Sequence, residues 1–175
     1  MIHLISLLKR FLSILKSYFH SIVDIPKFVS DEEKLIRVIL SPMNVNPNTQ
    51  NIKANIFKSP PNKDEVSVLR LFYTDADFCK THGKRIQNPN EKRNYYGLAV
   101  INTKEVRSVK ADVISSPDPI NNLEMHADIK VGYISIPHKT LLPEINYKID
   151  KMKRIARYFP DPDPESNKWE GDDLK

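Results

Sequence analysis

The first 25 residues alternate between hydrophobic and polar positions with the spacing of a helix. At about 100° per residue, one side of the helical wheel is apolar and the other is polar or basic. The apolar side holds Leu4, Leu7, Leu8, Phe11, Leu12, Ile14, Leu15, Tyr18, Phe19, Ile22 and Val23. The polar side includes Ser6, Lys9, Arg10, Ser13, Lys16, Ser17 and His20. This pattern predicts an amphipathic helix within residues 1–26, ended by Pro26, whose ring cannot continue a helix.

Three interpretations of this helix remain open. It lies on a membrane surface with its basic side toward anionic lipid, it docks on this protein's own core or on a partner, or it is an atypical membrane span or anchor. A membrane span needs roughly 20 mostly apolar residues, and basic residues interrupt this segment. We favour the membrane surface or a partner protein as the contact. The predicted lipid-contacting residues are Leu8, Lys9, Arg10, Phe11, Leu15, Lys16 and Phe19.

Residues 27–160 change to short apolar runs separated by turn residues. This pattern predicts one α+β domain with a small mixed or antiparallel sheet of about five or six strands and a C-terminal helix. We expect strands at 35–40, 65–73, 95–101, 111–115 and 127–135, and a short extended segment at 52–57. We expect helices from Thr74 to Gly83, over 103–109, and from Pro143 through Phe159.

Charge divides the chain into a basic body and an acidic end. The formal net charge is +5, but residues 161–175 carry −4, which leaves +9 on the remainder. This balance favours an anionic partner without identifying it. The acidic tail contains Asp-Pro-Asp-Pro, so we expect it to be extended or loose, with Trp169 as its one anchor.

Hydrophobic residues make up 40% of the chain and charged residues 28%, which excludes a wholly disordered chain or a multi-span membrane protein. A single cysteine, Cys79, excludes an intramolecular disulfide framework and favours a reducing compartment. No convincing secretory signal is present, because basic residues break the apolar N-terminus and no small-residue cleavage site follows. We therefore expect a cytoplasmic protein, peripheral at the inner face of the membrane.

The segment around His126 is the strongest candidate for chemistry. A loop rich in proline and asparagine delivers His126 to the start of a predicted strand, where the backbone is fixed and the ring stays accessible. If Ala127 and Ile129 face the core, His126 and Asp128 share the opposite face, where the carboxylate could orient the imidazole. A surface histidine beside a solvated carboxylate fits the same pattern.

Ser67 and Arg70 lie in the alternating strand and could assist His126 by clamping a phosphate or carboxylate. The alternative is an exposed arginine on a sheet face. These four residues, His126, Asp128, Ser67 and Arg70, are the predicted catalytic set.

Cys79 and His82 have the spacing of half a metal site, but no second cysteine completes it, so we predict no metal site. Cys79 is better explained by helix packing than by thiol chemistry. Glycine-rich phosphate loops are absent, and the sequence identifies no cofactor.

Basic residues also gather at the end of the predicted final helix. They are Lys151, Lys153, Arg154 and Arg157, and they could contact nucleic acid. A solvated helix face is the alternative, and no recognition motif is present.

Three segments together resemble a group of small uncharacterised bacterial proteins. They are Asp64-Glu65-Val66-Ser67-Val68-Leu69-Arg70, then Phe78 to Lys84, then Pro119 to Ile129 ending in His-Ala-Asp-Ile. The resemblance covers residues 34–170. In this chain Asn121-Asn122-Leu123-Glu124 stands where the group often has Asn-Pro. The resemblance implies a component of a bacterial defence or mobile-element locus.

These observations predict a membrane-surface-associated accessory or effector domain with a binding surface around His126. Two alternatives are a small hydrolase or nuclease that uses His126 and Asp128, and a nucleic-acid-binding module that uses the basic C-terminal helix.

Overall fold

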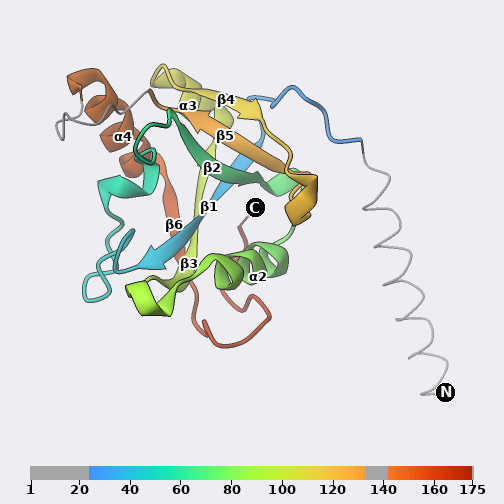
Figure 1. The fold of residues 1–175 in the computed structure, drawn as a ribbon, viewed down its shortest axis with the longest axis vertical. Helices are drawn as coiled ribbons and strands as arrows, with labels where there is room; N and C mark the ends of the chain where they lie inside the picture. The colour runs from blue at the N-terminus through green and yellow to red at the C-terminus, as the bar shows by residue number, and fades with distance from the viewer. Residues whose placement is uncertain (1–23, 133–141, 175) are drawn as a thin grey trace.

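A six-stranded antiparallel sheet forms the centre of the protein. The computed structural model describes residues 24–132 and 142–174 (Figure 1). The sheet has the strand order β4-β5-β2-β1-β3-β6. Its strands are β1 (Lys34–Ser41), β2 (Glu65–Arg70), β3 (Asn94–Asn102), β4 (Asp112–Ser115), β5 (His126–Lys130) and β6 (Arg157–Pro160). The predicted N-terminal helix and its lipid-contacting residues lie outside the described residues.

Helices cover both faces of the sheet. In the described residues these are α2 (Ala76–Ile86), α3 (Thr103–Ser108) and α4 (Pro143–Ile155), with 3-10 turns at Ala54–Phe57, Leu71–Tyr73, Pro89–Glu91 and Pro119–Asn121. The α+β class is therefore confirmed, and the sheet is antiparallel. None of the helices in the described parts of the chain is long and apolar enough to cross a membrane.

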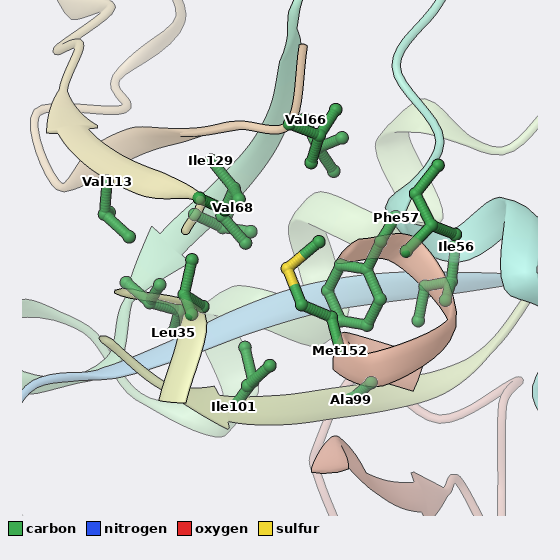
Figure 2. Close-up of a cluster of buried hydrophobic side chains, with 14 of the residues drawn as sticks. Leu35, Ile56, Phe57, Val66, Val68, Ala99, Ile101, Val113, Ile129 and Met152 are labelled. Atoms are coloured by element: carbon green, nitrogen blue, oxygen red, sulfur yellow. The ribbon is translucent and has the colours of Figure 1, made fainter. Parts of the chain in front are cut away.

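One face of the sheet packs against α3, α4 and the turn at Ala54–Phe57. Alternate residues of the strands point to this face, and the helices add Val106, Ile149 and Met152 (Figure 2). Phe57 and Met152 lie at its centre and are fully buried. This cluster is the larger of the two cores and removes the apolar sides of both helices from water, which is the main stabilising effect in a domain of this size.

The other face packs against α2, mainly over β1 and β3. Asp75 caps the helix by accepting a hydrogen bond from the backbone N–H of Phe78 at 2.8 Å. Gly83 lies inside the helix, where an added Cβ would come within 2.4 Å of the Tyr95 ring. The predicted helix end at Gly83 is therefore wrong, because this glycine provides close contact with β3 and the helix continues to Ile86.

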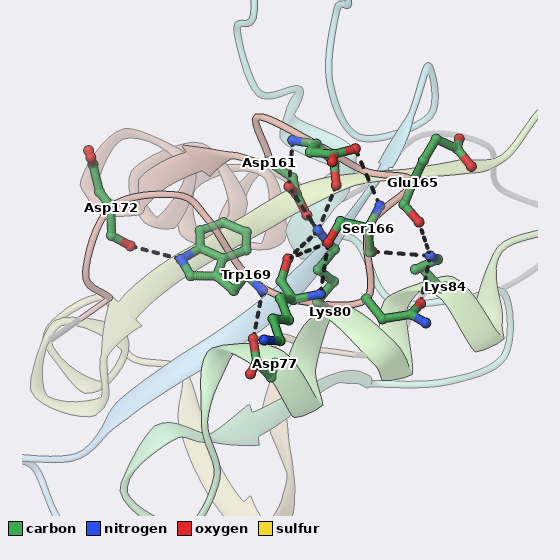
Figure 3. A network of polar contacts seen from close by, with 11 residues as sticks. Asp77, Lys80, Lys84, Asp161, Glu165, Ser166, Trp169 and Asp172 are labelled. Carbon is green, nitrogen blue, oxygen red and sulfur yellow. Dashed lines mark hydrogen bonds and ion pairs between the residues drawn. The ribbon is translucent and has the colours of Figure 1, made fainter. Parts of the chain in front are cut away.

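The acidic C-terminal segment is held against α2. The buried Nζ of Lys80 pairs with Asp161 at 2.9 Å and donates to the carbonyl oxygens of Asp163 and Lys168 at 2.7 Å each (Figure 3). The Trp169 backbone N–H donates to Asp77 Oδ1 at 2.6 Å. Residues after β6 form no helix or strand, as expected, but they are not loose, because several contacts besides Trp169 hold them.

Three further predictions about elements are corrected. Residues 54–57 form a 3-10 turn and not an extended segment. The strand predicted over 65–73 ends at Arg70, and a 3-10 turn follows it. The final helix ends at Ile155, so Arg157 and Phe159 belong to β6, which pairs with β3 at the sheet edge.

Candidate functional site

His126 begins β5, as the sequence predicted, and its ring is fixed by the preceding loop. The Nδ1 atom lies 2.8 Å from both the Oγ and the backbone oxygen of Ser116. A carbonyl oxygen can only accept, so Nδ1 carries the proton and donates to it. This leaves Nε2 as the ring atom available to a ligand or a proton, which is the usual arrangement of an oriented histidine.

Asp128 and Ser67 share one face of the sheet with His126. The β2–β5 register pairs Ser67 with Asp128 and Leu69 with His126. Directly paired residues point to the same side of a sheet, so three of the four predicted catalytic residues lie on one surface. Asp128 is buried and Ser67 is exposed. The expected role of Asp128 is not seen, because Ser116 and not this carboxylate orients the imidazole.

Arg70 does not join this surface. Its register partner is Leu35, which belongs to the core on the other face of the sheet. The guanidinium is fully buried and forms a two-pronged ion pair with Glu33, with Nε to Oε2 at 2.7 Å and Nη2 to Oε1 at 2.9 Å. Arg70 is therefore a structural residue, and the prediction that it assists His126 is not supported by its position.

Arg70 fixes the chain where it enters the domain. Its Nη1 donates to the Pro26 carbonyl at 2.6 Å and its Nη2 to the Phe28 carbonyl at 3.3 Å. Its backbone N–H donates to Met125 at 3.0 Å, one residue before His126. The segment that follows the predicted amphipathic helix is thus held next to the loop that carries His126.

Three residues that the prediction did not assign to this surface lie beside it on other elements, and one of them, His82, interacts electrostatically with His126. His82 and Arg85 come from α2, and Arg37 comes from β1. Arg85 Nη2 lies 3.1 Å from His82 Nδ1, and Arg85 Nη1 donates to the Asn121 carbonyl at 3.2 Å. Arg37 pairs with Ala99, which belongs to the core on the other face, but its guanidinium reaches β2, where Nη1 donates to the Ser67 carbonyl at 2.7 Å. Its charge there interacts with Asp128 and His82. Together with His126 and Asp128 these side chains form a polar surface beside α2, called here the His126 surface.

The electrostatics of this surface favour a neutral His82. Burial, together with the smaller effects of the nearby Arg85, His126 and Arg37, lowers the pKa of His82 to about 4. Burial also lowers the pKa of Arg37 to about 10, against the opposing effect of Asp128. Arg37 therefore remains charged at neutral pH, and its carboxylate neighbour is Asp128.

Large apolar side chains are exposed on three segments, before β1, after β2 and before β5. Phe28 is 71% exposed, Phe72 is 80% exposed and Ile120 is 93% exposed. The Arg70 guanidinium links the segment of Phe28 to that of Phe72. It contacts the Phe28 carbonyl and lies 4.6 Å from the ring centre of Tyr73, the residue after Phe72. Phe72 also lines a cavity of about 520 Å³ with Ser30, Glu32, Glu33, Lys34, Leu71 and Tyr73. We call Phe28, Phe72 and Ile120 the apolar edge.

The four predicted nucleic-acid-binding residues are divided between two elements. Lys151, Lys153 and Arg154 lie on α4, while Arg157 begins β6. The Lys151 Nζ lies 5.6 Å from the Tyr147 ring centre, and the Arg157 guanidinium lies 4.6 Å from that of Phe159. Nucleic-acid binding stays a prediction. A binding experiment would support it if the affinity for nucleic acid falls steeply with added salt.

Cys79 is fully buried against β3, and burial raises its thiol pKa to about 12. A nucleophilic cysteine needs the opposite, an exposed site with a lowered pKa. No cluster of three or more histidine, cysteine, aspartate or glutamate side chains that could hold a metal ion occurs in 24–132 or 142–174.

Comparisons with known proteins identify no relative: no protein family, curated protein or solved structure matches the chain.

Proposed function

We propose that the protein is a membrane-surface-associated accessory or effector domain whose binding surface is the His126 surface. The apolar edge supports the proposal most directly. Phe28 and Phe72 are exposed on the two segments that the Arg70 guanidinium connects to Pro26, close to where residues 1–23 join the domain, and Ile120 is exposed in the loop before β5. Large exposed apolar patches on proteins commonly mark a membrane or protein contact. A role in bacterial defence is proposed from the sequence resemblance alone.

Side-chain contacts hold the segment between Pro26 and β1 against the domain. Arg70 and Arg107 both hold the segment before β1, because Arg107 donates to the Val29 carbonyl at 2.9 Å and pairs with Asp31. An amphipathic helix joined to the body through such a segment would position the domain on the bilayer and not merely tether it. The apolar edge would then face the lipid beside the helix.

Vesicle co-sedimentation of the full chain tests the proposal. A variant with Leu8→Asp, Phe11→Asp and Leu15→Asp changes the apolar side of the predicted helix, and we expect it to lose binding to anionic vesicles. The matched control carries Ser6→Asp, Ser13→Asp and Ser17→Asp, which adds the same charge to the polar side. Equal binding by the two variants would contradict membrane association through this helix.

The apolar edge is tested separately. Phe72→Ser with Ile120→Ser should weaken vesicle binding at least tenfold, because each side chain would otherwise bury apolar area in the membrane. Tyr147→Ser is the control, since Tyr147 is 57% exposed on α4. Unchanged binding by the double variant would remove the edge from the membrane contact.

A small hydrolase is the second candidate function. The supporting observation is that Ser116 fixes His126 through Nδ1 and leaves Nε2 available for proton transfer. Ser67 and Asp128 lie on the same face, whereas Arg70 does not take part. Hydrolysis of a phosphodiester by the full chain, abolished by His126→Gln, would support this candidate. Activity that His126→Gln leaves unchanged would discard it.

A further inference from the structure

Arg85 carries a positive charge that no carboxylate balances in the described residues. Its two hydrogen-bonding partners, His82 Nδ1 and the Asn121 carbonyl, are neutral acceptors, and none of the ion pairs in those residues includes it. These two contacts hold the exposed guanidinium in place. An arginine has five N–H donors, so three of them remain for a ligand.

The neighbouring histidines add one donor and one acceptor to this guanidinium. An arginine only donates, so His82 Nδ1 accepts from Arg85 and the His82 proton lies on Nε2. His126 directs its Nδ1 to Ser116 and leaves Nε2 free. Arg37 adds a second guanidinium, whose buried Nε meets no acceptor in the described residues.

The carboxylate of this surface is already matched by a cation. Asp128 interacts electrostatically with Arg37, and this leaves Arg85 as the excess charge. Lys130, further along β5, is paired with Asp64 at 3.0 Å and with Glu65 at 2.9 Å. Asp118, the carboxylate in the loop of Asn121, accepts hydrogen bonds from Asn121. Arg85, at the end of α2, is therefore the guanidinium of this surface that no carboxylate matches in the described residues.

We propose that Arg85, His82 and His126, with Arg37 behind them, bind a phosphate group. The fixed Arg85 guanidinium and the His82 Nε2–H donate to phosphate oxygens and match the negative charge of the group, while the Nε2 lone pair of His126 accepts from the P–OH of a singly protonated phosphate monoester. The phosphate belongs either to a lipid headgroup or to a soluble phosphomonoester. Ile120 lies one residue from the Asn121 carbonyl that holds Arg85, so a headgroup bound here would place its acyl chains next to the apolar edge.

This inference rests on the proposed role of the His126 surface and is independent of membrane binding by residues 1–23. Titration of the full chain with inorganic phosphate and glycerol 3-phosphate, followed by the imidazole NMR signals, tests it. We expect saturable shifts of the His82 and His126 signals. Arg85→Gln should weaken binding about tenfold or more, and Arg85→Lys, which keeps the charge but not the fork, should weaken it less.

Lys104→Gln is the control, because Lys104 is an exposed cation on α3 that belongs to neither predicted binding set. The proposal is overturned if neither phosphate produces a saturable shift, if Arg85→Gln binds like the unchanged protein, or if Lys104→Gln loses as much affinity. In the last case the effect would come from net charge alone.

Vesicles distinguish the two sources of phosphate. Binding to phosphatidylcholine vesicles that increases with added phosphatidic acid and depends on Arg85 assigns a lipid headgroup. Soluble phosphate binding without that dependence assigns a soluble phosphomonoester. The triple variant Leu8→Asp, Phe11→Asp, Leu15→Asp should still bind soluble phosphate, so a failure of membrane association leaves this test intact.

Discussion

The Nζ of Lys80 and Oδ2 of Asp161 lie 2.9 Å apart, and both side chains are completely buried. This ion pair joins α2 to the residue that follows β6. Burying two charges removes their hydration, and the cost is offset only when each keeps its partner and its hydrogen bonds. Here two backbone carbonyls complete the contacts of the ammonium group.

Lys80→Met should lower the free energy of unfolding by roughly 3–5 kcal/mol, because it leaves the Asp161 carboxylate buried without its counter-charge. Urea unfolding measures the change. Lys84→Met is the control, since Lys84 donates at more exposed positions to Glu165 and Ser166 carbonyls. Adding Asp161→Asn to Lys80→Met should restore part of the loss. Equal stabilities for Lys80→Met and Lys84→Met would contradict this account.

Gly83→Ala should destabilise the protein by roughly 1–3 kcal/mol, the usual effect of overpacking. The added Cβ would lie 2.4 Å from Tyr95 Cδ2 and 3.0 Å from Val38 Cγ1. This clash outweighs the helix propensity of alanine, which favours it over glycine by about 1 kcal/mol. Thr81→Ala, at an exposed position of α2, should be close to neutral or slightly stabilising. A more stable Gly83→Ala protein would show that Tyr95 can move away.

Stability should fall as the pH is lowered from about 6.5 toward 4. The pKa of His82 is about 4 in the folded protein and near 6.5 when unfolded, so the unfolded chain binds the extra proton in this window. The stability gained by keeping His82 neutral is fully present above the unfolded pKa of 6.5 and is lost as the pH falls toward the folded pKa of about 4. With screening by solvent we expect a loss of roughly 1–2 kcal/mol. Unfolding experiments on His82→Gln should show a weaker pH dependence, and an unchanged one would exclude His82 as the cause.

The thiol of Cys79 should resist alkylation in the folded protein. Burial raises its pKa to about 12, so both access and thiolate formation are suppressed at neutral pH. Mass spectrometry after iodoacetamide treatment should find the native protein unmodified and the urea-unfolded protein fully modified. Rapid labelling without denaturant would mean that α2 opens readily from the sheet.

Sequence patterns located most strands because a sheet with two packed faces leaves clear apolar runs. The strand predicted over 65–73 is present in its first part, Glu65–Arg70, and the strand predicted from 127 begins at His126. The failures depend on contacts between distant residues. Gly83 signals a helix end locally, and only the Tyr95 ring explains why the helix continues past it. Arg157 and Phe159 keep helical spacing, yet pairing with β3 makes them a strand.

The candidate site was predicted in part for the same reason. His126, Asp128 and Ser67 follow from alternation, which fixes the side of a strand on which each residue lies. Arg70 alternates in the same way, but its buried partner Glu33 lies 37 residues earlier in the chain. Arg37 and Arg85 gave no local signal, because a single arginine on a strand or at a helix end is common on solvated surfaces. His82 was noticed only for its spacing from Cys79.

The separation of Lys80 and Asp161 by 81 residues sets a condition on biosynthesis. Until the ribosome has added β6 and Asp161, the nascent chain would have to place an ammonium group in its interior with no anion to meet it. The helix α2 is therefore expected to dock stably only once residue 161 has left the exit tunnel. Packing of α2 on the sheet is in this way postponed until the whole of residues 80–161 has been translated.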